Sequence, residues 1–220
     1  MKNFPVVEKF VSINGEGKKA GELSVFIRFR GCNLACSYCD TRWANTEEAQ
    51  AQLMTVKEIC DFVLETGVKN VTLTGGEPML QPGIETLVAA LAENAEVWVE
   101  IETNGSIDLA PFWYLPCSFT VDYKLPGSGM EPAMCLSNFA QIRAEDTVKF
   151  VAGSRKDLTC AKKVIDSYGL IGRTAVYISP VFGQIEPAEI VEFMIENQMN
   201  GVRMQLQMHK VIWDPDKKGV

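Results

Sequence analysis

Residues 70–91 read NVTLTGGEPMLQPGIETLVAAL, and this stretch contains the unit from which the fold is built. Its first five residues are rich in β-branched side chains, which predicts a strand that ends in a pair of glycines. After the turn, Leu87, Val88 and Leu91 recur at helical spacing and predict a helix with one apolar side. The stretch therefore predicts a strand, a turn and a helix in direct succession.

Outward from this unit, short β-rich runs keep alternating with longer runs of helical period. Such alternation indicates a parallel sheet with helices on its outer face. The strands are too few for a closed barrel of eight units, so we expect an α/β fold, an open partial (βα)6-type barrel with parallel strands, in a single domain of residues 1–220. The other predicted strands are residues 25–29, 97–102, 119–123, 147–151, 175–178 and 202–207, and the other predicted helices are residues 56–64, 158–168 and 186–197.

Polar and Gly-rich residues follow several of these strands at the point where each strand ends. Because ligands of open α/β folds bind outside the carboxyl ends of the strands, these segments predict a site at one rim of the sheet. The segments are Gly75-Gly76-Glu77-Pro78, Thr103-Asn104-Gly105, Asp122-Tyr123-Lys124 and Ser179-Pro180.

The composition excludes several classes of protein. The 220 residues include 21 Lys and Arg against 28 Asp and Glu, and this net charge of −7 without a basic run disfavours binding to nucleic acid. No apolar run approaches the roughly 20 residues of a membrane span, and Lys2 and Glu8 flank the start too closely for a secretion signal. We expect a cytoplasmic protein that binds neither nucleic acid nor membrane.

Seven cysteines and one histidine are the most informative counts. An odd number of cysteines excludes a complete set of disulfides, and a single histidine excludes any site that needs two imidazoles. Four cysteines stand singly among apolar or helical neighbours and are expected to be small packing residues: Cys60, Cys117, Cys135 and Cys160.

The remaining cysteines, Cys32, Cys36 and Cys39, form a C-x3-C-x2-C cluster in a polar loop after a predicted strand. A structural zinc ion would need a fourth ligand, which His209 or Cys60 could supply. The spacing suits a 4Fe-4S cluster better, because three thiolates then hold three irons and leave one iron open. An open metal position is typical of a catalytic site.

Two motifs of this sequence are similar, in combination, to those of a known superfamily. Tyr38 stands directly before the last cysteine of the cluster, and Gly75-Gly76-Glu77-Pro78 follows the next predicted strand. In this combination the chain resembles the radical S-adenosylmethionine superfamily, in which the second motif meets the methionine amino group. Glycines allow a close approach, and a carboxylate or carbonyl accepts hydrogen bonds from an ammonium group. The resemblance implies a radical S-adenosylmethionine core with shortened helical elements.

A narrower resemblance extends over nearly the whole chain. Its motifs are Ile13-Asn14-Gly15-Glu16-Gly17, Phe26-Ile27-Arg28, Cys39-Asp40-Thr41 and Gln205-Leu206-Gln207-Met208-His209-Lys210. They are similar to those of the 7-carboxy-7-deazaguanine synthase family. This likeness implies a ring contraction of 6-carboxy-5,6,7,8-tetrahydropterin to 7-carboxy-7-deazaguanine with release of ammonia, on the route to queuosine. It also implies a lyase that regenerates S-adenosylmethionine, a homodimer, and flavodoxin or ferredoxin as electron donor.

The same resemblance implies roles for individual residues. The 4Fe-4S cluster would be bound by Cys32, Cys36 and Cys39, and Mg²⁺ by Thr41. The pterin would be bound by Ile13, Asn14, Gly15, Glu16, Arg28, Thr74, His209 and Pro215, with Arg28 on its carboxylate. S-adenosylmethionine would be bound by Gly76, Glu77, Asp122, Tyr123, Lys124, Ser179, Pro180, Val181 and Phe182. In some family members the chain ends at the position of Pro215 and its carboxylate reaches the site, whereas here the sequence continues to Val220.

Simpler interpretations remain for several of these residues. They are a surface pair of Glu16 with Arg28, a helix cap at Thr41, a pair of Asp122 with Lys124, and a partly buried structural role for His209. Other functions also remain. One is an activating enzyme of an anaerobic glycyl-radical protein, which shares the cysteine spacing. The others are non-catalytic modules, either an iron–sulfur electron carrier or a zinc-folded adaptor.

Overall fold

The computed structural model describes residues 3–46, 48–93, 96–215 and 217–220. Nine strands in these ranges form one sheet in the order β3-β1-β2-β4-β5-β6-β7-β8-β9. Neighbouring strands from β2 to β9 are parallel, whereas β1 is antiparallel to both β2 and β3. The strands are β1 (Asn3–Ile13), β2 (Leu23–Phe29), β3 (Gln52–Thr55), β4 (Asn70–Gly75), β5 (Trp98–Thr103), β6 (Ser118–Tyr123), β7 (Thr147–Ala152), β8 (Ala175–Pro180) and β9 (Val202–Met204).

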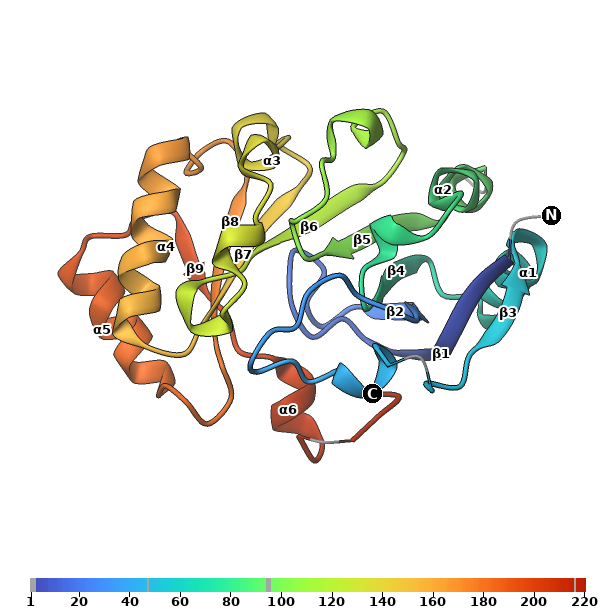
Figure 1. Cartoon of the computed structure of the whole chain (residues 1–220), viewed down its shortest axis with the longest axis horizontal. Coiled ribbons are helices and arrows are strands. Elements are labelled where there is room, and N and C mark those ends of the chain that lie inside the picture. The colour runs from blue at the N-terminus through green and yellow to red at the C-terminus, as the bar shows by residue number, and fades with distance from the viewer. Residues whose placement is uncertain (1–2, 47, 94–95, 216) are drawn as a thin grey trace.

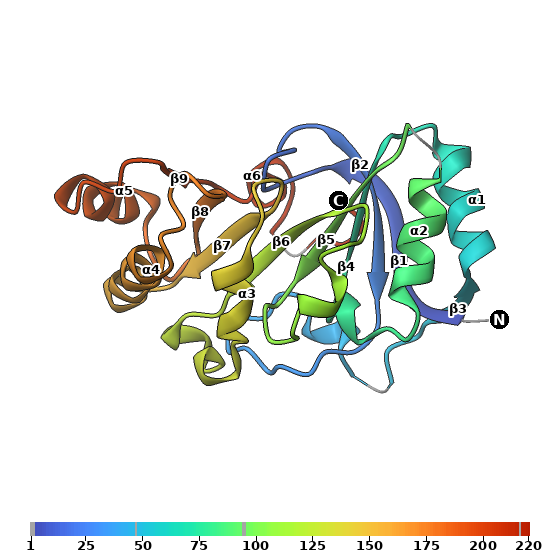
Figure 2. The same ribbon diagram turned by 90° about the horizontal axis from the view of Figure 1, so that it is seen from above.

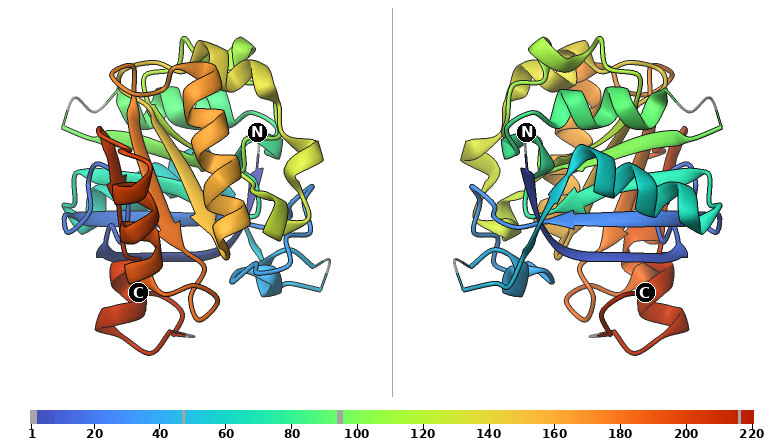
Figure 3. Two further views of the ribbon diagram at one scale, coloured as in Figure 1. Left: turned by 90° about the vertical axis from the view of Figure 1, so that its left-hand side faces the viewer. Right: turned by 90° about the vertical axis from the view of Figure 1, so that its right-hand side faces the viewer.

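The helices divide between two sides of this curved sheet. In Figure 1, α2 and α3 lie on the opposite side of the sheet from α6 and the C-terminus, and both views of Figure 3 show the same division. Figure 2 shows α1 and α2 at one end of the sheet and α4 and α5 at the other. The helices are α1 (Val56–Thr66), α2 (Ile84–Ala92), α3 (Leu136–Gln141), α4 (Arg155–Tyr168), α5 (Pro187–Glu196) and α6 (Met208–Ile212).

The predicted fold class is confirmed, since the sheet is mostly parallel, open and flanked by helices. Its crossovers are short: only a 3-10 turn at Ala110–Phe112 stands between β5 and β6, and α3 has six residues. No helix in the described ranges is long and apolar enough to cross a membrane.

The structure departs from the sequence prediction at both ends of the chain. Neither β1 nor β3 was expected, because their pairing is antiparallel and depends on partners distant in sequence. The strand predicted at residues 202–207 stops at Met204. The side chains of Gln205 and Gln207 then turn toward the loop at residues 14–17, and α6 begins at the next residue.

The ends of the helices follow local sequence signals. The side chain of Thr55 accepts a hydrogen bond from the Glu58 amide while the Glu58 carboxylate accepts one from the Thr55 amide, a capping box that begins α1. Gly67 ends α1 in the left-handed region with φ 68°, where glycine is favoured. Ser154 and Gly169 begin and end α4 in a similar way.

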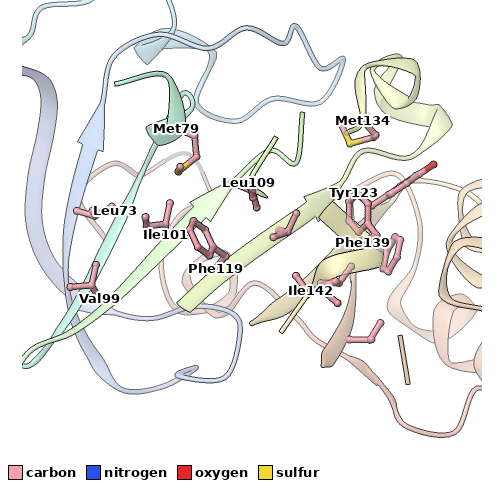
Figure 4. Packing of buried hydrophobic residues seen from close by; sticks show 14 of the residues in the cluster. Leu73, Met79, Val99, Ile101, Leu109, Phe119, Tyr123, Met134, Phe139 and Ile142 are labelled. Atoms are coloured by element: carbon pink, nitrogen blue, oxygen red, sulfur yellow. The ribbon is translucent and has the colours of Figure 1, made fainter. Parts of the chain in front are cut away.

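The core lies between the sheet and the helices on its outer side. Figure 4 shows Leu73, Ile101 and Phe119, from three adjacent strands, packed side by side. Tyr123 also points into this layer, where its ring lies 5.1 Å from that of Phe139. Because side chains alternate along a strand, the residues between these apolar ones project to the inner side of the sheet.

Candidate active site

The inner side of the sheet borders a cavity of about 640 Å³ at the carboxyl ends of the strands. Segments from most of the chain line it, from β1 to the C-terminal tail. Of the residues singled out in the sequence, those that line the cavity are Ile13, Asn14, Gly15, Glu16, Arg28, Cys32, Cys36, Cys39, Thr41, Thr74, Gly76, Asp122, Lys124, Val181, Phe182, His209 and Pro215. The structure thus brings the three cysteines and the residues predicted to bind the pterin to the same cavity.

Four other predicted residues do not line the cavity. Glu77 is fully buried, and its carboxylate accepts hydrogen bonds from the Asn104 amide at 2.6 Å and the Thr103 hydroxyl at 2.8 Å. Glu77 therefore ties β4 to β5, and burial raises its pKa against these hydrogen bonds. Tyr123 packs in the core on the far side of β6. Ser179 and Pro180 end β8 behind the cavity wall.

Four side chains on the cavity floor, Glu16, Asp122, Lys124 and Lys149, form what we call the charge network. Lys149 Nζ lies 3.3 Å from Glu16 Oε2 and 3.4 Å from Asp122 Oδ1. Lys124 Nζ lies 2.6 Å from the other oxygen of Asp122. Glu16 also accepts hydrogen bonds from Ser179 Oγ at 2.7 Å and Gln207 Nε2 at 3.1 Å. The network fixes the loop at residues 14–17 to strands β6, β7 and β8.

Mutual pairing decides the charge state of this network. Burial alone would raise the pKa of Glu16, but the charge of Lys149 and the two hydrogen bonds outweigh it and lower that pKa. Asp122 behaves in the same way because Lys124 and Lys149 flank it, and its pKa is also lowered. Although burial opposes the charge of Lys149, the surrounding carboxylates raise its pKa well above the ordinary value. All the members are therefore charged at neutral pH.

Glu102 is a further carboxylate in the cavity wall, next to the charge network. It accepts one hydrogen bond, from Thr74 Oγ1 at 2.8 Å. Burial raises its pKa, and neither Lys149 nor this hydrogen bond reverses the shift. The pKa values of neighbouring carboxylates in this cavity are thus shifted in opposite directions by their surroundings.

The cysteine loop, residues 30–41, contains no helix or strand. Amide groups approach two of its thiols: Asn104 Nδ2 lies 3.5 Å from Cys32 Sγ, and Asn45 Nδ2 lies 3.7 Å from Cys39 Sγ. Burial raises the pKa values of the Cys32 and Cys36 thiols.

The donor set fits an iron–sulfur cluster better than a single metal ion. Among the described residues, no three His, Cys, Asp or Glu side chains converge on one point that a single ion could occupy. A mononuclear zinc site requires such convergence, whereas each thiolate of a 4Fe-4S cluster binds a different iron. Donors to sulfur, as Asn104 and Asn45 provide, are typical of these clusters.

Gly76 lies where two loops approach each other very closely. A Cβ atom at this position would stand 1.8 Å from the carbonyl oxygen of Gly31 and 2.6 Å from Asn45 Oδ1. The amide of Glu77 donates to the same Gly31 carbonyl at 2.9 Å. Only glycine fits here, so the backbone at the end of β4 lies open to the cavity beside the cysteine loop.

Arg28 and Glu16 do not form a pair with each other, so that simpler interpretation was wrong. Arg28 Nε donates instead to Glu8 Oε2 at 3.0 Å, across the β1–β2 ladder. Thr41 precedes a 3-10 turn without capping it, and its hydroxyl donates to Asp40 Oδ1 at 3.3 Å. The Asp122–Lys124 pair does form, as part of the charge network.

The C-terminal segment closes one side of the cavity. The Gly17 amide donates to Gln205 Oε1 at 2.8 Å, and the Met208 amide donates to the Gly15 carbonyl at 3.2 Å. His209 then packs against Gly15, where a Cβ atom would stand 2.7 Å from its Nδ1. Burial lowers the pKa of His209 although Glu16 opposes the shift, so its imidazole is neutral at pH 7.

Beyond α6, the chain continues along the cavity. Pro215 and residues 217–220 line it, and Lys218 Nζ lies 4.0 Å from the centroid of the Trp43 ring. Lys210 Nζ lies 3.4 Å from Asp40 Oδ2 and so ties α6 to the cysteine loop. Residue 216, in the tail considered in the sequence, lies outside the described residues.

Sequence reasoning overlooked several residues of the site. Lys149 is a lysine within an apolar strand, and that pattern alone predicts a buried partner for its charge. Glu100 and Glu102 alternate with apolar residues on β5 and so face the inner side. Asn45 carried no local signal, since its position depends on how the loop folds back on Gly76.

The comparisons with known proteins agree with this geometry. Residues 26–111 match the family model of the radical SAM superfamily. A 7-carboxy-7-deazaguanine synthase of Clostridium acetobutylicum is 56% identical over 220 residues, which cover 99% of this chain and 100% of the relative. The corresponding enzyme of Chlorobaculum tepidum is 38% identical over 98% of this chain and 96% of its own.

A solved structure supports the fold. The crystal structure of QueE from Escherichia coli superposes with a TM-score of 0.74 at 19% identity and covers 94% of this chain and 95% of its own. The likeness to the full-length relatives shows that the chain belongs to the 7-carboxy-7-deazaguanine synthase family of radical S-adenosylmethionine enzymes.

Proposed function

We propose that this chain converts 6-carboxy-5,6,7,8-tetrahydropterin into 7-carboxy-7-deazaguanine with release of ammonia, as a step toward queuosine and related 7-deazapurines. One observation supports this function most directly. The three cysteines and the set Arg28, Glu16 and His209 line the same cavity, although residues 16 and 209 are far apart in the chain. A cluster ligand set and a receptor for a small acidic ring compound therefore share one cavity.

In this proposal Cys32, Cys36 and Cys39 hold the 4Fe-4S cluster. S-adenosylmethionine lies along the strand ends at Gly76, Asp122, Lys124, Val181 and Phe182. When bound, the two cofactors supply the one-electron chemistry that removes a hydrogen atom from the substrate. Because the Glu77 carboxylate already accepts hydrogen bonds from the Met79 and Asn104 amides and the Thr103 hydroxyl, its part is to fix the position of Gly76.

The side chains of this chain bind and orient the pterin. Arg28 takes the substrate carboxylate, since a guanidinium matches a carboxylate in a two-pronged hydrogen bond. Ile13, Asn14, Gly15 and Glu16 face the pterin ring edge. The charge network holds Glu16 in place before any ligand arrives, and such preorganisation lowers the cost of orienting a reactant.

The C-terminal side completes the site. His209, neutral at pH 7, faces the substrate and can accept or donate a hydrogen bond without adding charge. Pro215 and residues 217–220 line the cavity and would limit the access of water to the bound substrate. Thr41 would offer a hydroxyl ligand to Mg²⁺, which would supply positive charge near the substrate carboxylate.

The wider setting of the enzyme is also part of the proposal. The whole chain acts as one radical S-adenosylmethionine domain in the cytoplasm and as a homodimer, and flavodoxin or ferredoxin delivers electrons to the cluster.

A direct assay tests the function. The protein is reconstituted with iron and sulfide without oxygen and supplied with dithionite, Mg²⁺, S-adenosylmethionine and the carboxypterin. Mass spectrometry should then detect 7-carboxy-7-deazaguanine and an equal amount of ammonia. If the cluster assembles but only a glycyl-radical protein, and not the pterin, is turned over, the substrate assignment is wrong.

A further inference from the structure

Asn45 has one half of its side chain satisfied and the other half without a partner. Its Nδ2 lies 3.7 Å from Cys39 Sγ. Its Oδ1 is buried and is one of the few side-chain oxygens or nitrogens among the described residues that has no hydrogen-bond partner. An unsatisfied buried acceptor of this kind destabilises the folded chain. It therefore indicates a missing donor.

The surroundings of this oxygen point to the cavity. Asn45 lines the cavity together with Cys39, Gly75 and Gly76. Its Oδ1 would stand 2.6 Å from a Cβ atom at Gly76, so it lies against the glycine that the family motif places beside the methionine part of S-adenosylmethionine. No described protein donor faces this oxygen.

The backbone holds Asn45 firmly in this position. Its own amide donates to the Arg42 carbonyl at 3.1 Å, and the Gly31 amide donates to the Ala44 carbonyl at 3.3 Å. The Gly76 amide in turn donates to the Phe29 carbonyl at 3.1 Å. Three segments thus meet at the backbone that carries this side chain, and Nδ2 lies toward Cys39 and Oδ1 toward Gly76.

We infer that Asn45 is a positioning residue that links the two cofactors. Its Oδ1 accepts a hydrogen bond from the α-ammonium group of S-adenosylmethionine, and its Nδ2 donates to the thiolate of Cys39. An ammonium is the donor that suits this place, because a hydrogen bond to a charged group is stronger than a neutral one. The inference rests on the proposed function only through S-adenosylmethionine and does not involve the pterin.

Two variants of Asn45 distinguish its role as hydrogen-bond acceptor from its role as hydrogen-bond donor. Asn45→Ala removes both the acceptor and the donor, so it should weaken the binding of S-adenosylmethionine about tenfold or more and shift the midpoint potential of the cluster to a more negative value. Asn45→Asp keeps an acceptor but loses the donor. It should bind S-adenosylmethionine at least as tightly as the wild type and still shift the potential to a more negative value, since donors to sulfur favour the reduced cluster.

Binding and potential are measured without pterin on anaerobically reconstituted protein, by equilibrium dialysis and by EPR-monitored redox titration. Thr46→Ala, at an exposed position in the same loop, is the matched control and should change neither quantity. Iron content and thermal unfolding show whether each variant is folded and loaded. Unchanged binding in a loaded Asn45→Ala variant, or equal weakening in Asn45→Asp, would overturn the inference. Because product formation by the wild type is assayed separately, a failure here leaves the proposed function standing.

Discussion

The floor of the cavity and the cysteine loop at its rim are organised in opposite ways. On the floor, Glu16, Lys149 and Asp122 stand on or beside strands, and the charge of Lys149 pairs with both carboxylates at 3.3 and 3.4 Å. At the rim, Cys32, Cys36 and Cys39 lie in a loop without regular structure, and neutral amide groups lie 3.5 Å from Cys32 Sγ and 3.7 Å from Cys39 Sγ. In the proposed function, the folded chain therefore prepares the substrate side by itself, whereas the cofactor side is completed by the cluster.

The largest effect is expected at the rim, where the loss of one cysteine should prevent the cluster from binding. Cys36→Ala should abolish product formation and reduce bound iron, because a cluster with two protein thiolates is not held. Iron and sulfide analysis with an activity assay measures this. Cys135→Ala is the matched control, since Cys135 lies away from the cavity beside Ser137. If Cys135→Ala also lost its iron, the division of the cysteines into three and four would be wrong.

The second largest effect is expected on the floor, where removal of one charge should lower the stability of the protein. Lys149→Met leaves Glu16 and Asp122 without their shared cation, and breaking a buried ion pair typically costs about 3–5 kcal/mol in the free energy of unfolding. Urea unfolding of the variant and the wild type measures the difference. Lys57→Met is the control, because Lys57 pairs with Asp61 on the exposed side of α1. A surface pair of this kind contributes less than about 1 kcal/mol. Equal losses in the two variants would contradict a special role for the floor.

A third change tests whether the prepared side binds substrate. Arg28→Ala should raise the KM for the carboxypterin roughly 10- to 100-fold, as expected for a lost charged hydrogen bond, and should affect kcat less. Steady-state kinetics checks this. Glu8→Gln keeps the guanidinium and removes its ionic partner on β1, so its KM should stay near that of the wild type. A fall in kcat alone for Arg28→Ala would show that Arg28 does not bind the ground-state substrate.

The smallest effect concerns how the stability of the protein depends on pH through the carboxylates of the cavity. The lowered pKa values of Glu16 and Asp122 contribute stability that is present above their ordinary values of 4.5 and 3.8 and is lost as the pH falls through the lowered values. The raised pKa of Glu102 works in the opposite direction, because its contribution is present below 4.5 and is lost as the pH rises through the raised value.

Glu102→Gln should therefore stabilise the protein at pH 7, and this gain should disappear near pH 4. Glu16→Gln should destabilise it at pH 7, with the loss also shrinking in acid. Thermal unfolding across this pH range gives both differences. The same sign for the two variants at pH 7 would show that their surroundings do not set them apart.

The sequence predicted the parallel part of the sheet because its signals are local. Residues 70–74 are rich in β-branched side chains, and the helix at residues 84–91 has a clear apolar side, so β4 and α2 were both expected. The antiparallel strand β1 was not expected, since its partners are β2 and the distant strand β3. Likewise, residues 205–207 alternate like a strand, but hydrogen bonds to Gly17 and Glu16 end the strand at Met204.

The site shows the same limit. The cysteine spacing and the Gly75-Gly76 pair identify the cofactor side, because the chemistry of those residues is carried by adjacent positions in the sequence. The partners of Glu16 come from β7, β8 and the segment before α6. Only the folded chain brings such residues together, so the charge network could not be derived from spacing alone.

The account is tested most directly by the number of product molecules formed for each S-adenosylmethionine consumed. Reconstituted protein is given a limiting amount of S-adenosylmethionine and an excess of the carboxypterin, and 7-carboxy-7-deazaguanine and 5'-deoxyadenosine are quantified together. A regenerated cofactor should yield many molecules of product per S-adenosylmethionine, with little 5'-deoxyadenosine. One 5'-deoxyadenosine for every turnover, or cleavage of S-adenosylmethionine without any deazapurine, would contradict the account.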